Sequence, residues 1–416
     1  MAGNHYVLCI DLKSFYASVE CVDRGLNPFA VPLVVADKSR GKGSIVLAVS
    51  PYLRKFNVPS RLRIYELPER NDIIFATPRM SRYLEVSADI VNLYLDFVAE
   101  DDLHIYSIDE CFLDITRYLS YHEKDAYAIA KTIKRRILTE FGLTCTIGIG
   151  PNMLLSKVAM DIESKHTENG IACWTEEDIP EKVWTITPLN RFWGIGAQYQ
   201  KRLNSIGIYT VGDLAHYPKK LLIDKFGIIG GQMHDHANGI DTSSIREKFI
   251  PEHESFSSGQ VLMRDYTSEE VPLILEETLD DLILRLHYHQ KLCRGIHLSV
   301  RYSASVGGGF AHQTTFENPT DHFQILKNAL LHLFWKHVQN KPIRKITVTL
   351  TDILHSDYYQ TDLFSSPEEL EKQRRLLYTL AKIKEKYGKN AVLRASAKNP
   401  HSTIEERHEQ IGGHRK

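Results

Sequence analysis

The sequence lacks the features that mark several specialised classes of protein. No basic segment leading into a long apolar run stands near its start, and no stretch is long and apolar enough to cross a membrane. Its 6 cysteines form no Cys-x-x-Cys pair, and its 51 basic residues are balanced by 52 acidic ones. We therefore expect a cytoplasmic protein with reduced thiols that does not enter a membrane and is not disordered.

Charge is nevertheless unevenly distributed along the chain. Residues 285–345 contain few acidic side chains, only Glu317 and Asp321. The basic residues of the same segment are Arg285, Lys291, Arg294, Arg301, Lys327, Lys336, Lys341, Arg344 and Lys345. Such a segment either binds the phosphates of a nucleic acid or is an ordinary solvated surface, and charge alone does not decide between the two.

The first part of the chain has the pattern of a βαββαβ fold, and 416 residues are enough for several domains. Apolar runs and helical spacing predict strands at 6–12, 104–108, 111–115 and 144–148, and helices at 14–22, 79–99 and 124–141. Ser14 is the expected N-cap of the first helix. Strand-like runs at 31–36 and 45–50 indicate a small inserted subdomain, after which a strand at 73–76 returns to the main sheet.

The second part is helical and then mixed. Short helices at 199–205 and 211–215 around the Gly194-Ile195-Gly196 turn suggest a helix-hairpin-helix. After a linker near 247–254, helices at 269–291 and 323–338 and strands at 297–303 and 344–351 form a separate α+β module. A charged helix at 367–387 follows, and we expect the tail beyond it to be poorly ordered.

Three acidic residues stand where strands of the first fold end. Asp11 closes the first strand, and Asp109 and Glu110 join the two strands of the hairpin. These strands are central neighbours in a βαββαβ sheet, so we expect the three carboxylates to meet. Hard carboxylate oxygens suit magnesium, which catalyses phosphoryl and nucleotidyl transfer. One acid at a strand end is usually a solvated turn residue, and it is the joint placement that favours a metal site.

The residues around these acids resemble the two metal-binding motifs of Y-family, lesion-bypassing DNA polymerases. The motifs are Cys9-Ile10-Asp11-Leu12-Lys13-Ser14-Phe15-Tyr16-Ala17-Ser18-Val19-Glu20 and Ser107-Ile108-Asp109-Glu110. The first looks most like the polymerase V catalytic-subunit branch and its bacterial UV-damage-repair relatives. The resemblance implies an α+β, right-hand-like polymerase with a ferredoxin-like palm at 1–24 and 73–166, small fingers at 25–72, a helix-hairpin-helix thumb at 167–241, an α+β little finger at 252–354 and a C-terminal extension at 355–416.

The resemblance also implies a role for each residue that matches the family pattern. Asp11, Asp109 and Glu110 correspond to the ligands of two Mg²⁺ ions, with the carbonyl of Leu12 completing one site; Asp109 and Glu110 are the catalytic pair. The expected nucleotide contacts are Phe15, Tyr16, Arg54 and Lys165.

Tyr16 matches the steric gate, an aromatic ring that leaves no room for a 2′-hydroxyl group. Tyr16 could instead be a core aromatic, a role that Phe15 fits better. A family tyrosine that contacts phosphate is replaced by Pro51, and the neighbouring Tyr52 need not substitute for it.

The implied contacts to primer-template DNA lie in the thumb and the little finger. The backbone around Gly194 and Gly196 would hold a phosphate, although a Gly-x-Gly turn is also an ordinary turn between helices. In the basic segment the expected contacts are Arg294, Arg301, Arg344 and Lys345, and the resemblance favours DNA over a merely solvated surface.

Gln360-Thr361-Asp362-Leu363-Phe364 resembles the short motif with which bacterial polymerases bind a sliding clamp, with Gln360, Leu363 and Phe364 as its anchors. The same residues could instead be a hydrophobic staple that opens the helix at Pro367. A recombinase or an accessory subunit is a further expected partner, because relatives of polymerase V act with partner proteins.

The sequence therefore predicts an error-prone, nucleoid-associated DNA polymerase that uses dNTPs to extend a primer 3′-OH past damaged bases in the SOS response. No proofreading domain is evident. Two other readings are a palm-fold nucleotidyl cyclase, which would lack a thumb and little finger, and a non-catalytic clamp-binding scaffold, against which the intact acids argue.

Overall fold

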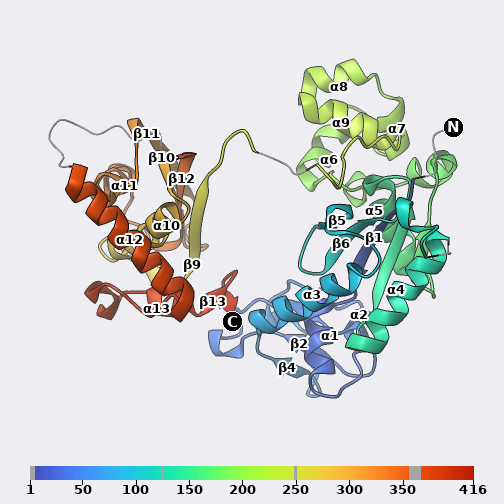
Figure 1. The fold of residues 1–416 in the computed structure, drawn as a ribbon, viewed down its shortest axis with the longest axis horizontal. Coiled ribbons are helices and arrows are strands. Elements are labelled where there is room, and N and C mark those ends of the chain that lie inside the picture. Colours follow the sequence, from blue (N-terminus) through green and yellow to red (C-terminus); the bar gives the residue numbers. More distant parts are fainter. Residues whose placement is uncertain (1–4, 123–124, 248–250, 356–366) are drawn as a thin grey trace. The chain divides into compact units, whose positions relative to one another are not determined.

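The chain forms two compact units, residues 1–248 and 249–416 (Figure 1). The computed structural model describes residues 5–122, 125–247, 251–355 and 367–416. Among these residues, no helix combines the length and apolar character that a membrane crossing requires. Each unit has its own sheet and its own apolar core.

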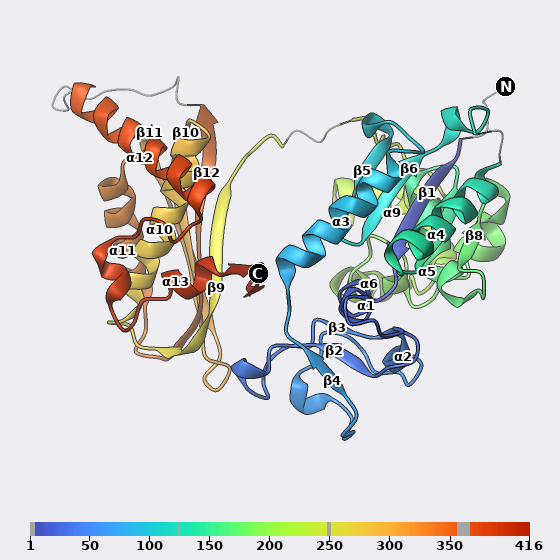
Figure 2. The same cartoon turned by 60° about the horizontal axis from the view of Figure 1, so that its bottom comes forward.

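The main sheet of the first unit has the strand order β5-β6-β1-β7-β8, so β5 and β8 are its outer strands. Its elements follow the expected βαββαβ order, with β8 added at one edge (Figure 2). They are β1 (Val7–Leu12), α3 (Met80–Tyr94), β5 (Leu103–Ile105), β6 (Glu110–Asp114), α4 (Ala126–Phe141), β7 (Cys145–Gly150), α5 (Met153–Ile162) and β8 (Ile171–Cys173). Strand β1 lies between β6 and β7 and is apolar apart from Asp11, so it forms the centre of the sheet.

The inserted subdomain is a second, three-stranded sheet with the order β3-β2-β4. Its strands are β2 (Leu33–Val35), β3 (Ala48–Val49) and β4 (Ile74–Ala76). Strand β4 pairs in parallel with β2, so the prediction that it returns to the main sheet is wrong. The expected boundary at residue 72 therefore cuts through this small sheet, because periodicity identifies a strand but not its partner.

Ser14 precedes α1 (Phe15–Val22) but does not cap it in the predicted way. Its backbone is left-handed, with φ at 49°, and its side chain makes no capping hydrogen bond. The Ser14 carbonyl accepts a hydrogen bond from the Ser18 N–H at 2.9 Å. A left-handed residue turns the chain sharply, so that α1 begins almost directly after the strand that carries Asp11.

Four helices form most of the region after β8: α6 (Ala197–Asn204), α7 (Val211–His216), α8 (Lys219–Phe226) and α9 (Ile228–Ala237). The Gly194-Ile195-Gly196 turn lies between a single 3₁₀ turn, Leu189–Arg191, and α6. The two helices expected after it are present as α6 and α7. Helices α8 and α9 were not expected; they pack closely, and a Cβ at Gly230 would lie 2.2 Å from the Leu222 carbonyl oxygen.

The second unit contains a four-stranded sheet with the order β11-β10-β12-β9 and two helices packed on it. These elements are β9 (Phe256–Tyr266), α10 (Val271–Tyr288), β10 (Lys291–Tyr302), β11 (Gly309–Thr320), α11 (Phe323–His337) and β12 (Ile343–His355). Both edge strands, β9 and β11, are absent from the sequence prediction. Their exposed and half-buried positions carry mostly polar residues, which weakens the apolar signal of a strand.

The expectation of a poorly ordered tail is wrong for the residues after α12 (Pro367–Tyr387). They form helix α13 (Ile404–His408) and a hairpin of β13 (Gln410–Ile411) and β14 (His414–Arg415). Ile404 and His408 are only 5% and 2% exposed. The sequence signal was weak because this segment is held mainly by polar contacts rather than by an apolar stripe.

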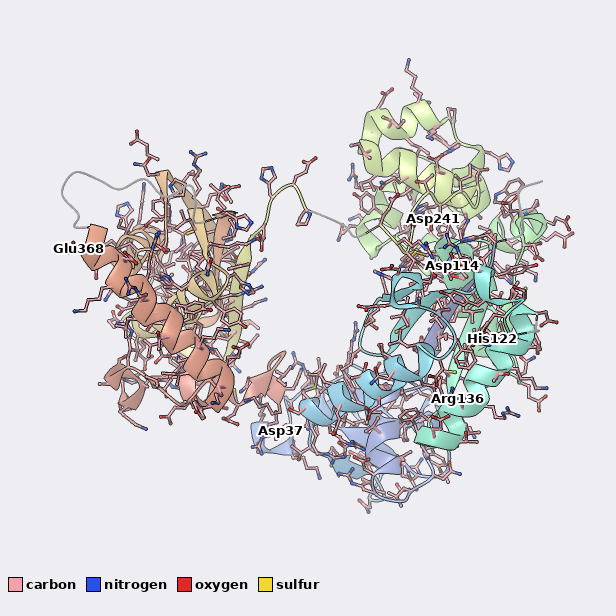
Figure 3. The ribbon with its side chains drawn as sticks, in the orientation of Figure 1. Asp37, Asp114, His122, Arg136, Asp241 and Glu368 are labelled. Atoms are coloured by element: carbon pink, nitrogen blue, oxygen red, sulfur yellow. The ribbon has the colours of Figure 1, made fainter. Side chains whose placement is uncertain are left out.

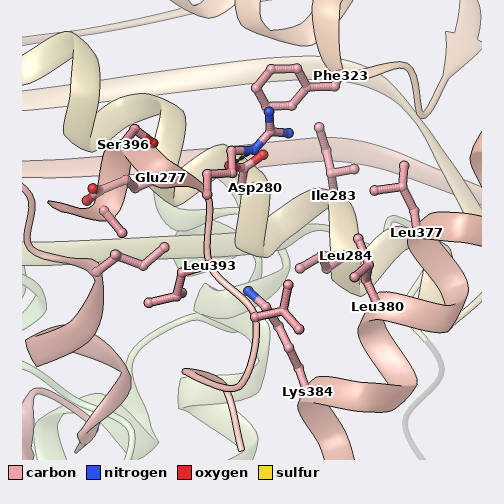
Figure 4. A pocket seen from close by; sticks show the side chains of 14 residues that line it. Glu277, Asp280, Ile283, Leu284, Phe323, Leu377, Leu380, Lys384, Leu393 and Ser396 are labelled. Atoms are coloured by element: carbon pink, nitrogen blue, oxygen red, sulfur yellow. Dashed lines mark ion pairs between the residues drawn. The ribbon is translucent and has the colours of Figure 1, made fainter. Parts of the chain in front are cut away.

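Three acidic residues of α10 anchor this tail. Asp281 binds Arg407 at 2.6 Å and His408 at 3.0 Å, and Asp280 binds Arg394 at 2.6 Å. Glu277 accepts a hydrogen bond from the backbone N–H of Thr403 at 3.2 Å. A cavity of about 120 Å³ remains between α10, α12 and the tail (Figure 4).

Candidate active site

The main sheet places the three predicted acids together where its central strands β1 and β6 meet end to start; this side of the sheet is called the acid edge below, or simply this edge. Strands β1 and β6 are antiparallel, so the end of one meets the start of the other, and Asp11 pairs directly with Glu110. Asp109 immediately precedes β6, and its carbonyl accepts a hydrogen bond from the Leu12 N–H at 2.9 Å. The Asp109 side chain accepts a hydrogen bond from the Ser107 hydroxyl at 2.7 Å. The two motifs are therefore neighbours in the sheet.

Helix α5 packs closely on β7 because two positions of this strand are glycines. A Cβ at Gly148 would lie 2.0 Å from the Ser156 carbonyl oxygen, and one at Gly150 would lie 2.5 Å from the Ser156 nitrogen. The start of α5 is fixed by Asn152, which accepts from the Leu155 N–H at 2.8 Å, and by Asp241, labelled in Figure 3, which accepts from the Leu154 N–H at 3.1 Å.

Two lysines from α5 and the turn after it bind the predicted metal ligands. Lys157 lies 2.7 Å from Glu110, and Lys165 lies 2.7 Å from Asp11. Asp161 lies between the lysines, 3.1 Å from Lys157 and 2.7 Å from Lys165. The five side chains form a series of alternating charge that connects the two acids.

Burial makes the acids dependent on these cations. It raises the pKa of Asp11, Lys165 opposes the rise, and the nearby charge of Asp109 adds to it. Burial likewise raises the pKa of Glu110 against the effect of Lys157, and Asp11 adds to the rise. The three carboxylates therefore lie close enough to repel one another, and a positive charge between them favours their ionised forms.

The donor chemistry of this edge fits a divalent metal ion. Asp11, Asp109 and Glu110 supply hard carboxylate oxygens, the ligands that Mg²⁺ prefers. As the side chains stand, no three His, Cys, Asp or Glu residues in the described part of the chain are grouped to hold a metal. A lysine already contacts one oxygen of Asp11 and another contacts one oxygen of Glu110, so a metal would compete with an ammonium group for these carboxylates.

Tyr16 and Phe15 differ in burial. Phe15 is 3% exposed and belongs to the core, whereas Tyr16 is half-buried. The ring of Tyr16 stacks on that of Tyr83 with centroids 4.6 Å apart, and the Tyr83 hydroxyl donates to the buried Glu20 at 2.7 Å. Tyr83 thus holds the Tyr16 ring in place. Sequence reasoning missed this contact, because nothing in a helical pattern tells which distant ring a tyrosine will meet.

Arg54 ends the short helix α2 (Pro51–Arg54) in the inserted subdomain. Its side chain is exposed and donates to the Ser60 hydroxyl at 2.8 Å. Pro51 occupies the first turn of this helix, which Ser50 caps. The Tyr52 ring packs within the subdomain, 5.1 Å from that of Phe56.

The Gly194–Gly196 turn is open. Gly194 has φ at +89°, and a Cβ built at either glycine meets no atom within 4 Å. Gly196 immediately precedes α6, whose first backbone N–H groups have no intrahelical partners. The turn therefore has room for a ligand that approaches the backbone.

The sheet of the second unit presents a polar face. Arg301 on β10 pairs in register with Lys345 on β12, and both are exposed. Further along the same strands Ser299 lies opposite Thr347. Arg294 is exposed at an irregularity of β10, and Arg344 lies 3.5 Å from Asp265.

Other basic residues of the 285–345 segment have partners within the unit: Lys291 binds Glu254, and Lys327 binds Glu276. The predicted clamp motif, with Gln360, Leu363 and Phe364, lies outside the described residues. No finding bears on that prediction.

Lys157 and Asp161 are the site residues that sequence reasoning missed. With Lys165 they are spaced four residues apart, which places them on one side of a helix. That spacing was the available signal. It is common on solvated helices and points to a site only when the helix is known to lie on the acids.

Comparisons with known proteins show which family the chain is similar to. Residues 10–161 match the profile of the impB/mucB/samB family, and residues 253–363 match that of its C-terminal domain. The chain is 42% identical to the Bacillus subtilis (strain 168) protein named "Putative UV-damage repair protein UvrX", over 98% of this chain and 97% of that protein. It is 32% identical to DNA polymerase IV 2 of the same organism over the full length of both. A solved Y-family DNA polymerase chimera, Dbh-Dpo4(243-245)-Dbh, matches 84% of this chain and 99% of its own, with a TM-score of 0.68 and 20% identity.

Proposed function

Because the chain belongs to the impB/mucB/samB family of Y-family DNA polymerases, we propose that it extends a primer on a DNA template and continues past damaged bases. The main support from the structure is the register that pairs Asp11 with Glu110 beside Asp109. Transfer of a nucleotidyl group needs positioning and charge more than covalent chemistry, and this edge supplies both.

Polymerases of this family use divalent metal ions, and we assign two Mg²⁺ ions to this site. Asp11, Asp109 and Glu110 would hold them together with the Leu12 carbonyl. Bound there, the ions would supply positive charge to the phosphate oxygens. Lys165, whose side chain is 38% exposed, would contact the triphosphate of the incoming dNTP, and Arg54 would approach it from the inserted subdomain.

The decisive experiment is primer extension with Mg²⁺ on an undamaged template and on one with an abasic site. We expect extension by the wild type, with some products past the lesion. The Asp109→Ala/Glu110→Ala variant should lose at least about 10³-fold in rate, because the metal ligands are gone, and should still bind DNA. Glu100→Ala/Asp101→Ala, an exposed acidic pair in the same unit, is the matched control and should extend normally.

Two outcomes would contradict the proposal. Normal extension by the Asp109→Ala/Glu110→Ala variant would refute the assignment of the metal ligands. A wild type that binds DNA but extends no primer, even with clamp and recombinase added, would favour the non-catalytic scaffold. A nucleotidyl cyclase would have no use for the second unit and would not incorporate dNTPs into a primer.

We assign Tyr16 as the steric gate because its half-buried ring follows the strand that carries Asp11. Tyr16→Ala should raise the use of ribonucleotides by at least about tenfold, since the space for a 2′-hydroxyl is restored. Tyr16→Phe keeps the ring and should keep the discrimination. Single-nucleotide incorporation with dNTP and rNTP measures both, and no gain in Tyr16→Ala would return Tyr16 to a structural role.

Binding of primer-template DNA falls to both units in this proposal. The open turn at Gly194 and Gly196 would hold a backbone phosphate, and Arg294, Arg301, Arg344 and Lys345 would hold others without reading sequence. Docking on a sliding clamp through Gln360, Leu363 and Phe364, and action with a recombinase or accessory subunit at the nucleoid, are further parts of it. Loss of clamp-stimulated extension on replacing Leu363 and Phe364 by alanine would support the clamp contact.

A further inference from the structure

The series Glu110, Lys157, Asp161, Lys165 and Asp11 poses a problem for metal loading. Asp11 and Glu110 are assigned as metal ligands, yet both hold an ammonium group at 2.7 Å. Lys165 contacts Oδ2 of Asp11 and Lys157 contacts Oε1 of Glu110, so a divalent cation bound to either carboxylate would lie close to an ammonium group and be repelled by it. Loading is therefore favoured when a lysine moves away and finds another partner.

The two lysines differ in their freedom to move. Lys157 is 7% exposed, lies on the helix that packs closely on β7, and shares Glu110 with the Cys9 thiol. The Lys165 side chain is 38% exposed and follows the end of α5. Lys165 is thus the cation that can leave. Its other acid partner is Asp161, already 2.7 Å away.

We propose that Asp161 is a positioning residue that takes over Lys165 when a divalent cation binds Asp11. The inference rests on the proposed function, since it concerns the same acids. With Asp161 in place, Lys165 keeps an ion pair throughout the exchange. Without Asp161, the displaced ammonium would lose its acid partner, and that cost would appear as weaker binding of the metal ion.

Binding of Mn²⁺ to the protein without DNA or nucleotide tests this proposal directly. The electron paramagnetic resonance signal of free Mn²⁺ gives the dissociation constant independently of catalysis. Asp161→Asn should weaken Mn²⁺ binding by about fivefold, the effect of losing one partly exposed ion pair. Lys165→Ala, which removes the competing cation, should bind Mn²⁺ at least as tightly as the wild type.

A loss of negative charge near the site could by itself weaken metal binding. The double variant separates this effect from the proposed one. If Asp161 acts by holding Lys165, then Asp161→Asn should change the dissociation constant by less than about twofold once Lys165 is alanine. If it acts only as a nearby charge, the fivefold loss should persist in that background.

Asp235→Asn on α9 is a matched control. Asp235 binds Lys219 at 2.7 Å and its side chain is 32% exposed, against 30% for Asp161. This variant loses a similar ion pair away from the acids and should bind Mn²⁺ like the wild type. Thermal unfolding of each variant confirms that it is folded.

The outcomes distinguish this inference from the proposed function. A wild type that binds Mn²⁺ and extends primers, with an Asp161→Asn variant of equal Mn²⁺ affinity, would overturn the role of Asp161 alone. An effect that persists without Lys165 would do the same. A wild type that neither binds Mn²⁺ nor extends primers would overturn both.

Discussion

Among the described residues, two clusters of largely buried acids pair with different cations. At the edge of the first unit's main sheet, Asp11 and Glu110 hold the ammonium groups of lysines. On α10 of the second unit, Asp280 and Asp281 hold the guanidinium groups of arginines, and Asp281 also holds a histidine. The geometry of the ion pairs is similar, but the chemistry of the cations is not.

The choice of lysine or arginine distinguishes the candidate active site from the contact that holds the tail on α10. A lysine is a single charge on a flexible chain, so it can be exchanged for another cation. Arginine forms several directed hydrogen bonds at once: Arg407 donates to Asp281, to the Thr278 hydroxyl at 2.9 Å and to the Glu277 carbonyl at 3.1 Å. Such a contact fixes a fold. We infer that the lysines of the first cluster can be replaced by another cation, whereas the arginines of the second cluster hold the fold permanently.

The largest expected effect is a loss of stability in the second cluster. Arg407→Ala should lower the free energy of unfolding of the second unit by about 3 kcal/mol, because Asp281 loses a largely buried partner. Chemical denaturation followed by circular dichroism measures the loss. Arg375→Ala is the matched control: Arg375 pairs with Glu371 at 2.6 Å but is 77% exposed, and its loss should cost less than about 0.5 kcal/mol.

The corresponding variant of the first cluster is Lys165→Ala. If the active-site pair is built for exchange, this variant should lose nucleotide affinity while its unfolding free energy stays within about 1 kcal/mol of the wild type. Equal destabilisation by Arg407→Ala and Lys165→Ala would remove the distinction between the two clusters.

A somewhat smaller effect concerns pH. Burial raises the pKa of Asp280 to about 6, although Arg394 opposes the rise. Between its ordinary pKa and this value the folded state binds more protons than the unfolded state. The free energy of unfolding should therefore fall by about 2–3 kcal/mol as the pH rises from 4 to 7, with most of the fall complete slightly above pH 6.

Asp280→Asn should remove this contribution to the slope of unfolding free energy against pH, whatever its effect on the stability at any one pH. Asp281 is the matched control on the same helix, because its pKa is lowered: burial would raise it, but His408 and Arg407 more than compensate. Asp281 therefore titrates at lower pH than an ordinary aspartate, and Asp281→Asn should leave most of the pH dependence in place, reduced only by the small effect of its charge on the pKa of Asp280. Urea unfolding at several pH values measures both, and an unchanged slope in Asp280→Asn would refute the assignment.

The smallest effect concerns cations that pair with no acid among the described residues. Arg301 and Lys345 are exposed on the sheet of the second unit. Replacing either by alanine should reduce the salt dependence of DNA binding by about one unit in the slope of log K against log[salt]. Lys327→Ala, which removes a cation already bound to Glu276 at 2.8 Å, should change the slope less. Equal slopes in all three variants would contradict DNA binding by this face.

The acids of the candidate site could be predicted from the sequence because strand periodicity and topology act together. Asp11 lies next to the end of an apolar strand, Glu110 begins another directly after Asp109, and a βαββαβ order makes these strands neighbours. The distinction between Phe15 as core and Tyr16 as partly accessible also agrees with their burial. That distinction came from the family motif, because helical spacing alone also allows Tyr16 to be a core aromatic.

Other features depend on contacts that periodicity does not encode. Strand β4 was assigned to the wrong sheet because its partner is chosen by the tertiary fold. The roles of Lys157 and Asp161 appear only once Gly148 and Gly150 let α5 lie directly on the sheet. The order of the tail depends on Arg407 and His408 meeting Asp281 more than 120 residues away in the sequence.

The packing of the tail on α10 bears on how the second unit should be handled in the laboratory. The family's C-terminal profile ends at residue 363, before α12 and α13. A recombinant fragment that ends at that boundary would lack α12 and the tail. Helix α10 would then be exposed, and its acidic groups would lose their cations. We expect such a fragment to aggregate, and one that extends through residue 416 to be the better choice for crystallisation and for solution studies of the isolated unit.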